Sequence, residues 1–131
     1  MTVRSFCNAD LPHLVRLWNE HWSAIGPDPM IDMARLEQAV LARTFFAPDS
    51  LLVAESTTAD STEIVGWCLY YVDPHCPPTT VVAALCVNQR GDASAADDLL
   101  NAVECKSTAA GIECLCVGAI RDREFGLAGL C

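Results

Sequence analysis

The sequence predicts an α/β fold in which one mixed β-sheet carries helices on both faces, in the order β-α-α-β-β-β-α-β. Two observations indicate this fold. Stretches with apolar residues at helical spacing alternate with short runs typical of strands. The last two strands are joined by a helix and should run parallel, whereas the earlier strands should pair as antiparallel hairpins. The length of 131 residues and the 52% apolar content suit one domain over residues 1–131.

The first two helices follow a short strand, "TVRSF". The stretch "NADLPHLVRLWNEHWSAIG" predicts a helix that Asn8 or Asp10 caps, with Pro12 in its first turn. Its apolar stripe consists of Leu11, Leu14, Val15, Trp18 and Trp22. "GPDP" then breaks the chain, and a second helix is expected over residues 32–46. That helix should turn Met33, Leu36, Val40 and Phe45 inward.

The remaining elements are three strands, a helix and a last strand. "SLLVAES" and "IVGWCLYYV" predict a hairpin, and the nearly continuous apolar run "TVVAALCV" is typical of a central strand. A helix is expected over residues 93–110. Gly111 suits the position that directly follows a helix, and the strand "IECLCVGAI" comes next. The residues of this helix expected to face inward are Ala96, Leu99, Leu100 and Val103.

Charge limits the classes of partner. The net charge of −9 and the pI near 4.5 argue against binding to nucleic acid and to an anionic membrane surface. The same charge permits a cationic substrate. Because no apolar run reaches the length of a membrane span and the N-terminus has no apolar signal region, we expect a cytoplasmic protein.

The eight cysteines form no C-x-x-C motif, which argues against a zinc ribbon or a thioredoxin-type site, and we expect no metal. They should be reduced thiols, and most lie inside apolar runs, where a thiol acts as a small hydrophobe. Cys114 and Cys116 are two residues apart and share one strand face, which we expect to be buried. His75 and Cys76 are adjacent and should point in opposite directions.

The order of elements resembles the GNAT (Gcn5-related) N-acetyltransferase fold over about residues 2–119. Three stretches carry the resemblance. The opening "TVRSFCNADLPHLVRLW" is similar to the family's first strand and helix, and "LLVAES…TEIVGWCLYYV" is similar to its second and third strands, where a glycine commonly opens the third. "VVAALCVNQ" with "DDLLNAVECKSTAAGIECLCV" is similar to the fourth strand, cofactor helix and fifth strand.

The resemblance implies an acetyl-CoA site where the fourth strand ends. In the family, that strand pairs with the pantetheine arm, and a Q/R-x-x-G-x-G/A turn offers amide groups to the pyrophosphate. Here the turn is "GDASAA": Gly91 stands at the Gln/Arg position, Ser94 at the first glycine and Ala96 at the Gly/Ala position. With a one-residue shift, Gln89 or Arg90 takes the Gln/Arg role. The implied cofactor residues are Leu85, Cys86, Val87, Ser94, Ala95 and Ala96.

Two departures weaken the resemblance. Asp92, Asp97 and Asp98 surround the turn and would repel a pyrophosphate, and Ser94 suits a helix cap as well as a phosphate ligand. The family adds a helix and a closing hairpin after its fifth strand, whereas about a dozen residues follow Ile120 here, without the tyrosine that often acts as acid. The chain is therefore expected to be a fragment of a longer one, such as one half of a tandem GNAT protein, or a reduced, non-catalytic version of the fold.

No motif identifies a general base, so the catalytic residues stay unknown at this level. The backbone N–H near Val87 is suited to polarise a thioester carbonyl. Each candidate for the base can instead be an ordinary surface or turn residue. The candidates are Glu55, Glu63, Asp73, His75, Glu113, Glu20 and His21.

Two functions fit the sequence. The first is an N-acetyltransferase domain that transfers acetyl from acetyl-CoA to an amine, on a small molecule or a peptide and suited to a cationic acceptor. The alternative is a non-catalytic interaction or regulatory domain of a tandem or dimeric protein, with a homodimer or a second GNAT domain as its partner.

Overall fold

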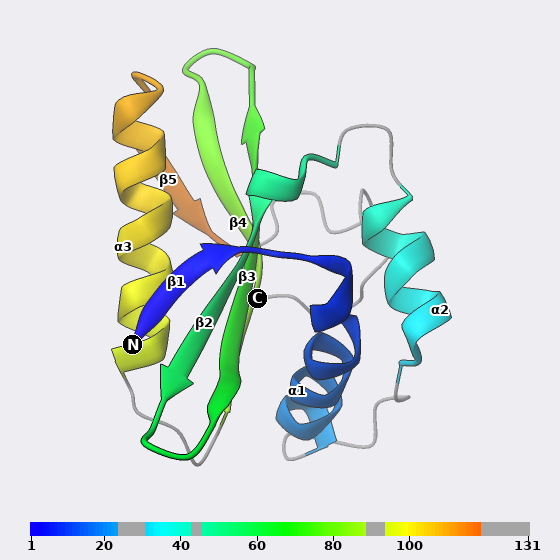
Figure 1. Cartoon of the computed structure of the whole chain (residues 1–131). Helices are drawn as coiled ribbons and strands as arrows, with labels where there is room; N and C mark the ends of the chain where they lie inside the picture. The colour runs from blue at the N-terminus through cyan, green and yellow to red at the C-terminus, as the bar shows by residue number, and fades with distance from the viewer. Residues whose placement is uncertain (24–30, 43–45, 89–93, 119–131) are drawn as a thin grey trace.

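The structure is a computed structural model that describes residues 1–23, 31–42, 46–88 and 94–118, without the side chain of Trp22. Its strands form one sheet in the order β1-β2-β3-β4-β5, which is also their order in the chain (Figure 1). β1 to β4 pair antiparallel, and β4 and β5 pair parallel, as predicted. The strands are β1 Thr2–Ser5, β2 Leu51–Thr57, β3 Thr62–Asp73, β4 Thr79–Val87 and β5 Cys114–Val117.

Helices cover both faces of this sheet, which confirms the predicted fold class (Figure 1). On one face lie α1 (Leu11–Ser23) and α2 (Met33–Leu36), which continues as a π-helical segment, η2 (Glu37–Leu41). α3 (Ser94–Ala109) lies on the other. Two short 3-10 turns are added, η1 (Asn8–Asp10) and η3 (Pro48–Ser50). No described helix is long and apolar enough to cross a membrane.

The predicted cap residue Asp10 takes part in capping η1, the turn that precedes α1, but from the third position of that turn and not as its N-cap. Cys7 is the N-cap of η1, and Asp10, three residues later, accepts a hydrogen bond of 2.8 Å from the Cys7 backbone N–H. Asp10 has this role because it is buried and also accepts two hydrogen bonds from Arg4, of 2.8 and 2.9 Å. These bonds lower the pKa of Asp10 to about 2. The Arg4 Nε also donates to Glu55 at 2.8 Å, which ties β1 to β2.

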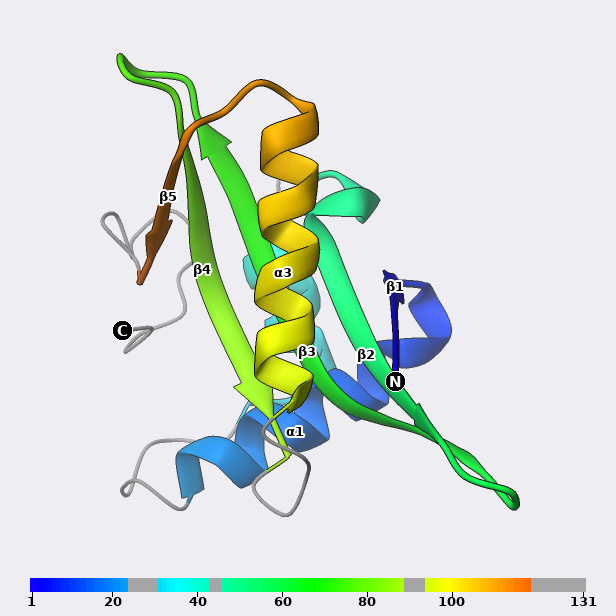
Figure 2. The ribbon, with the colours of Figure 1, turned by 90° about the vertical axis from the view of Figure 1, so that its left-hand side faces the viewer.

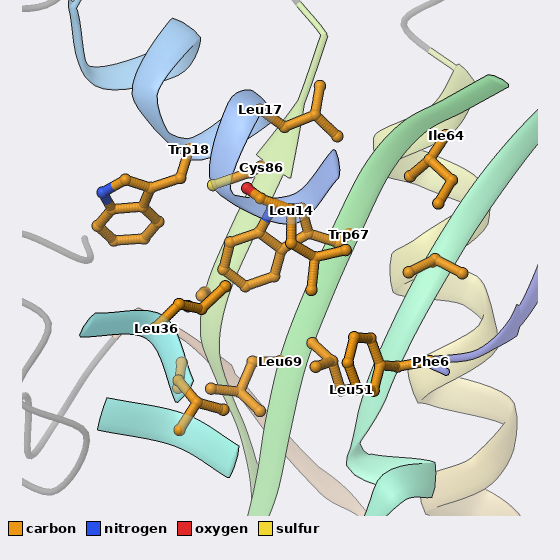
Figure 3. Packing of buried hydrophobic residues seen from close by; sticks show 14 of the residues in the cluster. Phe6, Leu14, Leu17, Trp18, Leu36, Leu51, Ile64, Trp67, Leu69 and Cys86 are labelled. Atoms are coloured by element: carbon orange, nitrogen blue, oxygen red, sulfur yellow. The ribbon is translucent and has the colours of Figure 1, made fainter. Parts of the chain in front are cut away.

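The larger part of the core lies between the sheet and α1 with α2 (Figure 3). The rings of Trp18 and Trp67 stack at a centroid distance of 6.0 Å, and Trp67 Nε1 donates to the Leu14 carbonyl at 3.1 Å. Burial of such side chains is the main favourable contribution to folding. Of the predicted inward residues, Leu14, Trp18, Leu36 and Val40 are buried, and Leu17 joins them without having been predicted.

One predicted core position, Met33, did not enter this cluster. Met33 is half exposed because it opens α2, next to the capping residue Asp32, whose side chain accepts from the Arg35 N–H at 2.7 Å. Phe45 and the side chain of Trp22 lie outside the described residues. The face of α2 that meets the sheet therefore begins one turn later than the sequence suggested.

The second part of the core lies under α3. Leu99 and Val103 are buried against Leu52, Cys68 and Val82, as the helical spacing predicted. Ala95 is buried in place of Ala96, and Leu100 is only partly buried. α3 ends with Gly111 at φ +77°, a left-handed conformation that favours glycine, in agreement with its predicted position.

The cysteines divide into two groups. Cys68 and Cys86 are buried in the centre of the sheet, where desolvation raises the pKa of each thiol to about 12. Cys114 is exposed and Cys116 is partly exposed, so the prediction that their shared face is buried was wrong. The reason is position: β5 is a short strand at the edge of the described sheet, and no described helix covers that face.

Candidate functional site

The strand β4 contains an extra residue, Ala83. Leu69 of β3 pairs with Ala84, and the next residue, Tyr70, pairs with Val82, so that Ala83 has no partner of its own. This is a β-bulge, which bends a strand and changes which way its side chains point. Ala83 and Ala84 accordingly both face α1 and α2, although they are adjacent.

The bulge lies where β5 stops pairing with β4. β5 pairs with residues 79–82 of β4, and the last hydrogen bond there is donated by the Gly118 N–H to the Val82 carbonyl, at 3.1 Å. Beyond it, no described strand pairs with residues 83–87 on the side away from β3 (Figure 2). Among the described residues, 83–87 therefore form an open β4 edge, whose outward backbone N–H and C=O groups have no strand partner there.

The open β4 edge ends beside the first turn of α3 (Figure 2). The Asn88 N–H donates to the Val65 carbonyl at 2.7 Å and holds the end of β4 on β3. Gly66 makes the close packing of α3 possible: a Cβ there would lie 3.1 Å from Val87 Cγ1 and 3.2 Å from both Cys86 O and Leu99 Cδ1. The two halves of the predicted cofactor site, a strand end and a helix start, thus lie at the same end of the sheet.

The six predicted cofactor residues differ in what they offer. Leu85 and Val87 are partly buried toward α3, whereas Cys86 is buried on the opposite face, in the cluster that contains Trp18 and Trp67 (Figure 3). The Cys86 thiol therefore faces away from α3, and the open edge offers its backbone. Ser94 is the first residue of α3, Ala95 is buried against the sheet and Ala96 is partly buried.

The start of α3 combines a positive helix end with acids. A helix of 16 residues presents unpaired N–H groups and the positive end of its dipole to an anion. Asp97, in its first turn, is exposed, and Asp98 is partly exposed. The remainder of the predicted turn, with Gln89, Arg90, Gly91 and Asp92, lies outside the described residues.

Most of the candidate bases have structural partners. The Glu55 carboxylate is bound by Arg4, and Arg16 contacts both Glu20 and Glu63, at 3.2 and 3.3 Å. No described interaction singles out one of these carboxylates as a general base. Glu55 and Glu63 instead join two elements of the fold, and Glu20 pairs within α1.

Of the other candidates, Asp73 and His75 lie away from the start of α3 (Figure 2). Asp73 contacts His75 at 2.5 Å in the turn between β3 and β4, which Figure 2 shows at the opposite end of the sheet, together with Cys76. Glu113 is exposed just before β5, and His21 is in the last turn of α1. The part of the chain that the structure describes holds no group of three or more His, Cys, Asp or Glu side chains suited to a metal ion.

Comparisons with family models and with curated proteins give no match. Solved structures do match. A ribosomal-protein-alanine N-acetyltransferase from Brucella melitensis is 20% identical over 88% of this chain and 72% of that chain, with a TM-score of 0.66. An aminoglycoside acetyltransferase from an uncultured soil metagenomic sample, in complex with sisomicin, is 18% identical over 93% and 80%, with a TM-score of 0.59.

An N-acetylglutamate synthase from Neisseria gonorrhoeae, complexed with coenzyme A and N-acetyl-glutamate, is 17% identical, with a TM-score of 0.62. It matches 87% of this chain, which spans 24% of that longer protein. At these identities, what the chain shares with the three proteins is the fold.

Proposed function

From the GNAT fold of this chain, we propose that it binds acetyl-CoA along the open β4 edge and transfers the acetyl group to an amine. The observation that carries the proposal is the bulge at Ala83, which coincides with the end of β4–β5 pairing and leaves residues 83–87 unpaired on one side among the described residues.

The local chemistry fits the cosubstrate. The pantetheine arm of acetyl-CoA is an extended chain with two amides, and a strand edge offers alternating donors and acceptors to such a chain. The backbone N–H groups of residues 94–96 are suited to the pyrophosphate, because small side chains there leave room for it. Gly66 allows the strand end and the helix start to lie close enough to serve one ligand.

The transfer needs little from side chains. The amine nitrogen forms a bond to the thioester carbonyl carbon, the carbon–sulfur bond breaks to release the coenzyme A thiolate, and the proton that the amine loses neutralises this thiolate. A backbone N–H near Val87 would stabilise the negative charge that develops on the carbonyl oxygen. The general base stays unassigned. The net charge of −9 favours a cationic acceptor, as either a small molecule or a peptide.

A binding measurement tests this proposal. A ligand at 100 times its dissociation constant stabilises a protein by about 2.7 kcal/mol, so millimolar acetyl-CoA should raise the melting temperature clearly. Ser94→Asp places a negative charge at the start of α3 and should abolish the shift. Asn101→Asp adds the same charge on an exposed position of the same helix and should keep it.

Activity is tested with a panel of amines, by following acetylated product and released coenzyme A by chromatography. A thiol reagent is unsuitable because Cys7, Cys76, Cys105 and Cys114 are exposed. If acetyl-CoA binds but no amine is acetylated, the alternative of an interaction domain gains support. If millimolar acetyl-CoA produces no shift, the proposed site is wrong.

A further inference from the structure

We infer that β5 and α3 together form a docking site for an extended segment of a partner chain, with the side-chain pattern apolar-x-apolar-x-basic. This inference does not depend on acetyl transfer. It starts from a groove of about 580 Å³ between α3 and β5, on the face of β5 that α3 covers only in part. Its lining includes Leu100, Glu104, Ile112, Glu113, Leu115 and Val117.

The floor of the groove is apolar and unusually exposed. Leu115 and Val117 are 40% and 58% exposed, although both belong to a strand of the sheet. They alternate with Cys114 and Cys116 and so share one face of the strand. Because both line the groove together with residues of α3, this is the face on the side of α3. A ligand that covers these two side chains would remove their apolar surface from water, which favours binding.

The backbone of β5 offers a second binding element. β5 is the last strand of the sheet that the structure describes, and no described strand pairs with its outer edge. An extended segment can add to such an edge through main-chain hydrogen bonds, while its alternate side chains contact the face below. The edge determines that the occupant is a strand, and the apolar pair Leu115 and Val117 determines that two of its side chains on that face are apolar.

The charge of the groove determines the third side chain. Glu113 lies two residues before Leu115 and therefore shares its face, and Glu104 projects from α3 into the same groove. Among the described residues, neither carboxylate takes part in an ion pair. The negative end of the α3 dipole adds to this field. A Lys or Arg opposite Glu113, two positions from an apolar residue, is the matching partner.

The probe is a pair of labelled peptides, Val-Thr-Val-Thr-Lys and its reverse, Lys-Thr-Val-Thr-Val, which cover both strand directions. The control peptide, Val-Lys-Val-Thr-Thr, has the same composition but carries its lysine on the other face. Fluorescence anisotropy should show at least one probe binding about tenfold more tightly than the control. Equal binding of probe and control would mean non-specific attraction to an acidic protein and would overturn the inference.

Protein variants locate the site. Glu113→Lys and Leu115→Ser should each weaken probe binding about tenfold, whereas the exposed controls Glu37→Lys and Val72→Ser should leave it unchanged. A probe with N-methyl groups on its hydrogen-bonding amides should also fail to bind. If it binds as well as the parent peptide, the occupant is not an added strand.

Two other occupants are outcomes of the same experiment. If Arg121→Glu with Arg123→Glu strengthens probe binding, residues 119–131 of this chain compete for the groove, and the partner-chain inference is wrong. If sedimentation without peptide shows a dimer that Leu115→Ser dissociates, the occupant is a second copy. A monomer that binds the probe, with binding unaffected by the two arginines, supports the inference.

Discussion

The Ser107 hydroxyl of α3 lies 2.7 Å from Thr80 Oγ1 of β4, and both side chains are buried. Ser107 Oγ is also 2.8 Å from the Val103 carbonyl oxygen of its own helix. Thr80 pairs with Leu115 of β5, so the hydroxyl pair joins α3 to the half of β4 that is still covered by β5. The helix is therefore fixed at one end of β4, while the open edge lies at the other.

The two partners of this pair should respond unequally to mutation. Ser107→Ala removes the partner of a fully buried Thr80 hydroxyl and should cost about 1–3 kcal/mol in the free energy of unfolding. Thr80→Val should cost less, because Ser107 keeps the Val103 carbonyl. Urea denaturation of both variants and of the double variant measures this. Equal losses for the single variants, with full additivity in the double, would contradict the assignment.

Acid should weaken the fold through Asp10. Arg4 lowers the pKa of Asp10 to about 2 from an ordinary value of 3.8. A carboxyl with a lowered pKa stabilises the fold above its unfolded pKa and loses that contribution as pH falls through its folded pKa. Stability should therefore fall by about 2 kcal/mol between about pH 4 and pH 2 because of this group.

Asp10→Asn should remove that part of the acid dependence and lower stability at pH 7. Asp60→Asn, at an exposed position in the turn between β2 and β3, serves as the control and should leave the pH profile unchanged. The comparison is made by urea denaturation from pH 2 to 7. A wild-type profile retained by Asp10→Asn would show that another carboxyl is responsible.

Gly66 should be intolerant of alanine for a steric reason. The added Cβ would press on Val87 Cγ1, Cys86 O and Leu99 Cδ1, at 3.1–3.2 Å, and we expect a loss of about 1–3 kcal/mol. Since Val87 belongs to the open β4 edge, the proposed affinity for acetyl-CoA should fall as well.

Gly111→Ala provides a matched comparison. A Cβ there meets nothing within 4 Å, but φ is +77°, so alanine should cost about 1 kcal/mol through backbone strain alone. Acetyl-CoA affinity, measured by calorimetry well below both melting temperatures, should be unchanged in this variant. If both variants lose affinity equally, the effect follows stability and not the position of β4.

Thiol reactivity should separate the cysteines into two classes. At pH 8, iodoacetamide should alkylate Cys105 and Cys114 quickly, because they are exposed. Cys68 and Cys86 should react only after unfolding, because burial excludes the reagent and raises the pKa of both thiols to about 12. Mass spectrometry of timed digests reports each site. Alkylation of Cys86 at the rate of Cys105 in folded protein would show that β4 opens.

The periodicity of the sequence was sufficient for the fold class and for most of the core, since Leu14, Leu36 and Leu99 are buried where the pattern placed them. The periodicity failed where the outcome depends on the place of a strand in the sheet or on a contact with a distant residue. The apolar run around Cys114 indicates a strand but not its place at the edge of the sheet. Asp10 has the side chain of an N-cap residue, yet it lies at the third position of η1, where it is buried and bound by Arg4.

The candidate site was predictable only in part. Resemblance located the strand end and the helix start, and the structure places Leu85, Val87 and Ala95 together in one cluster. The bulge was missed, because "TVVAALCV" reads as an uninterrupted strand and the only signal is its pair of alanines. The groove beside Leu115 was also missed, since it depends on how β5 and α3 lie relative to each other.

The extra residue in β4 reverses which sheet face the odd-numbered and even-numbered side chains of the strand point to. On each side of Ala83, the side chains alternate regularly between the face covered by α1 and α2 and the face covered by α3. The two halves of the strand are out of phase by one residue. Loss of one codon would bring them back into phase and let a neighbouring strand run along the whole edge. A sheet of this kind can therefore gain or lose a ligand-accessible edge in one mutational event, through a single small residue of its core.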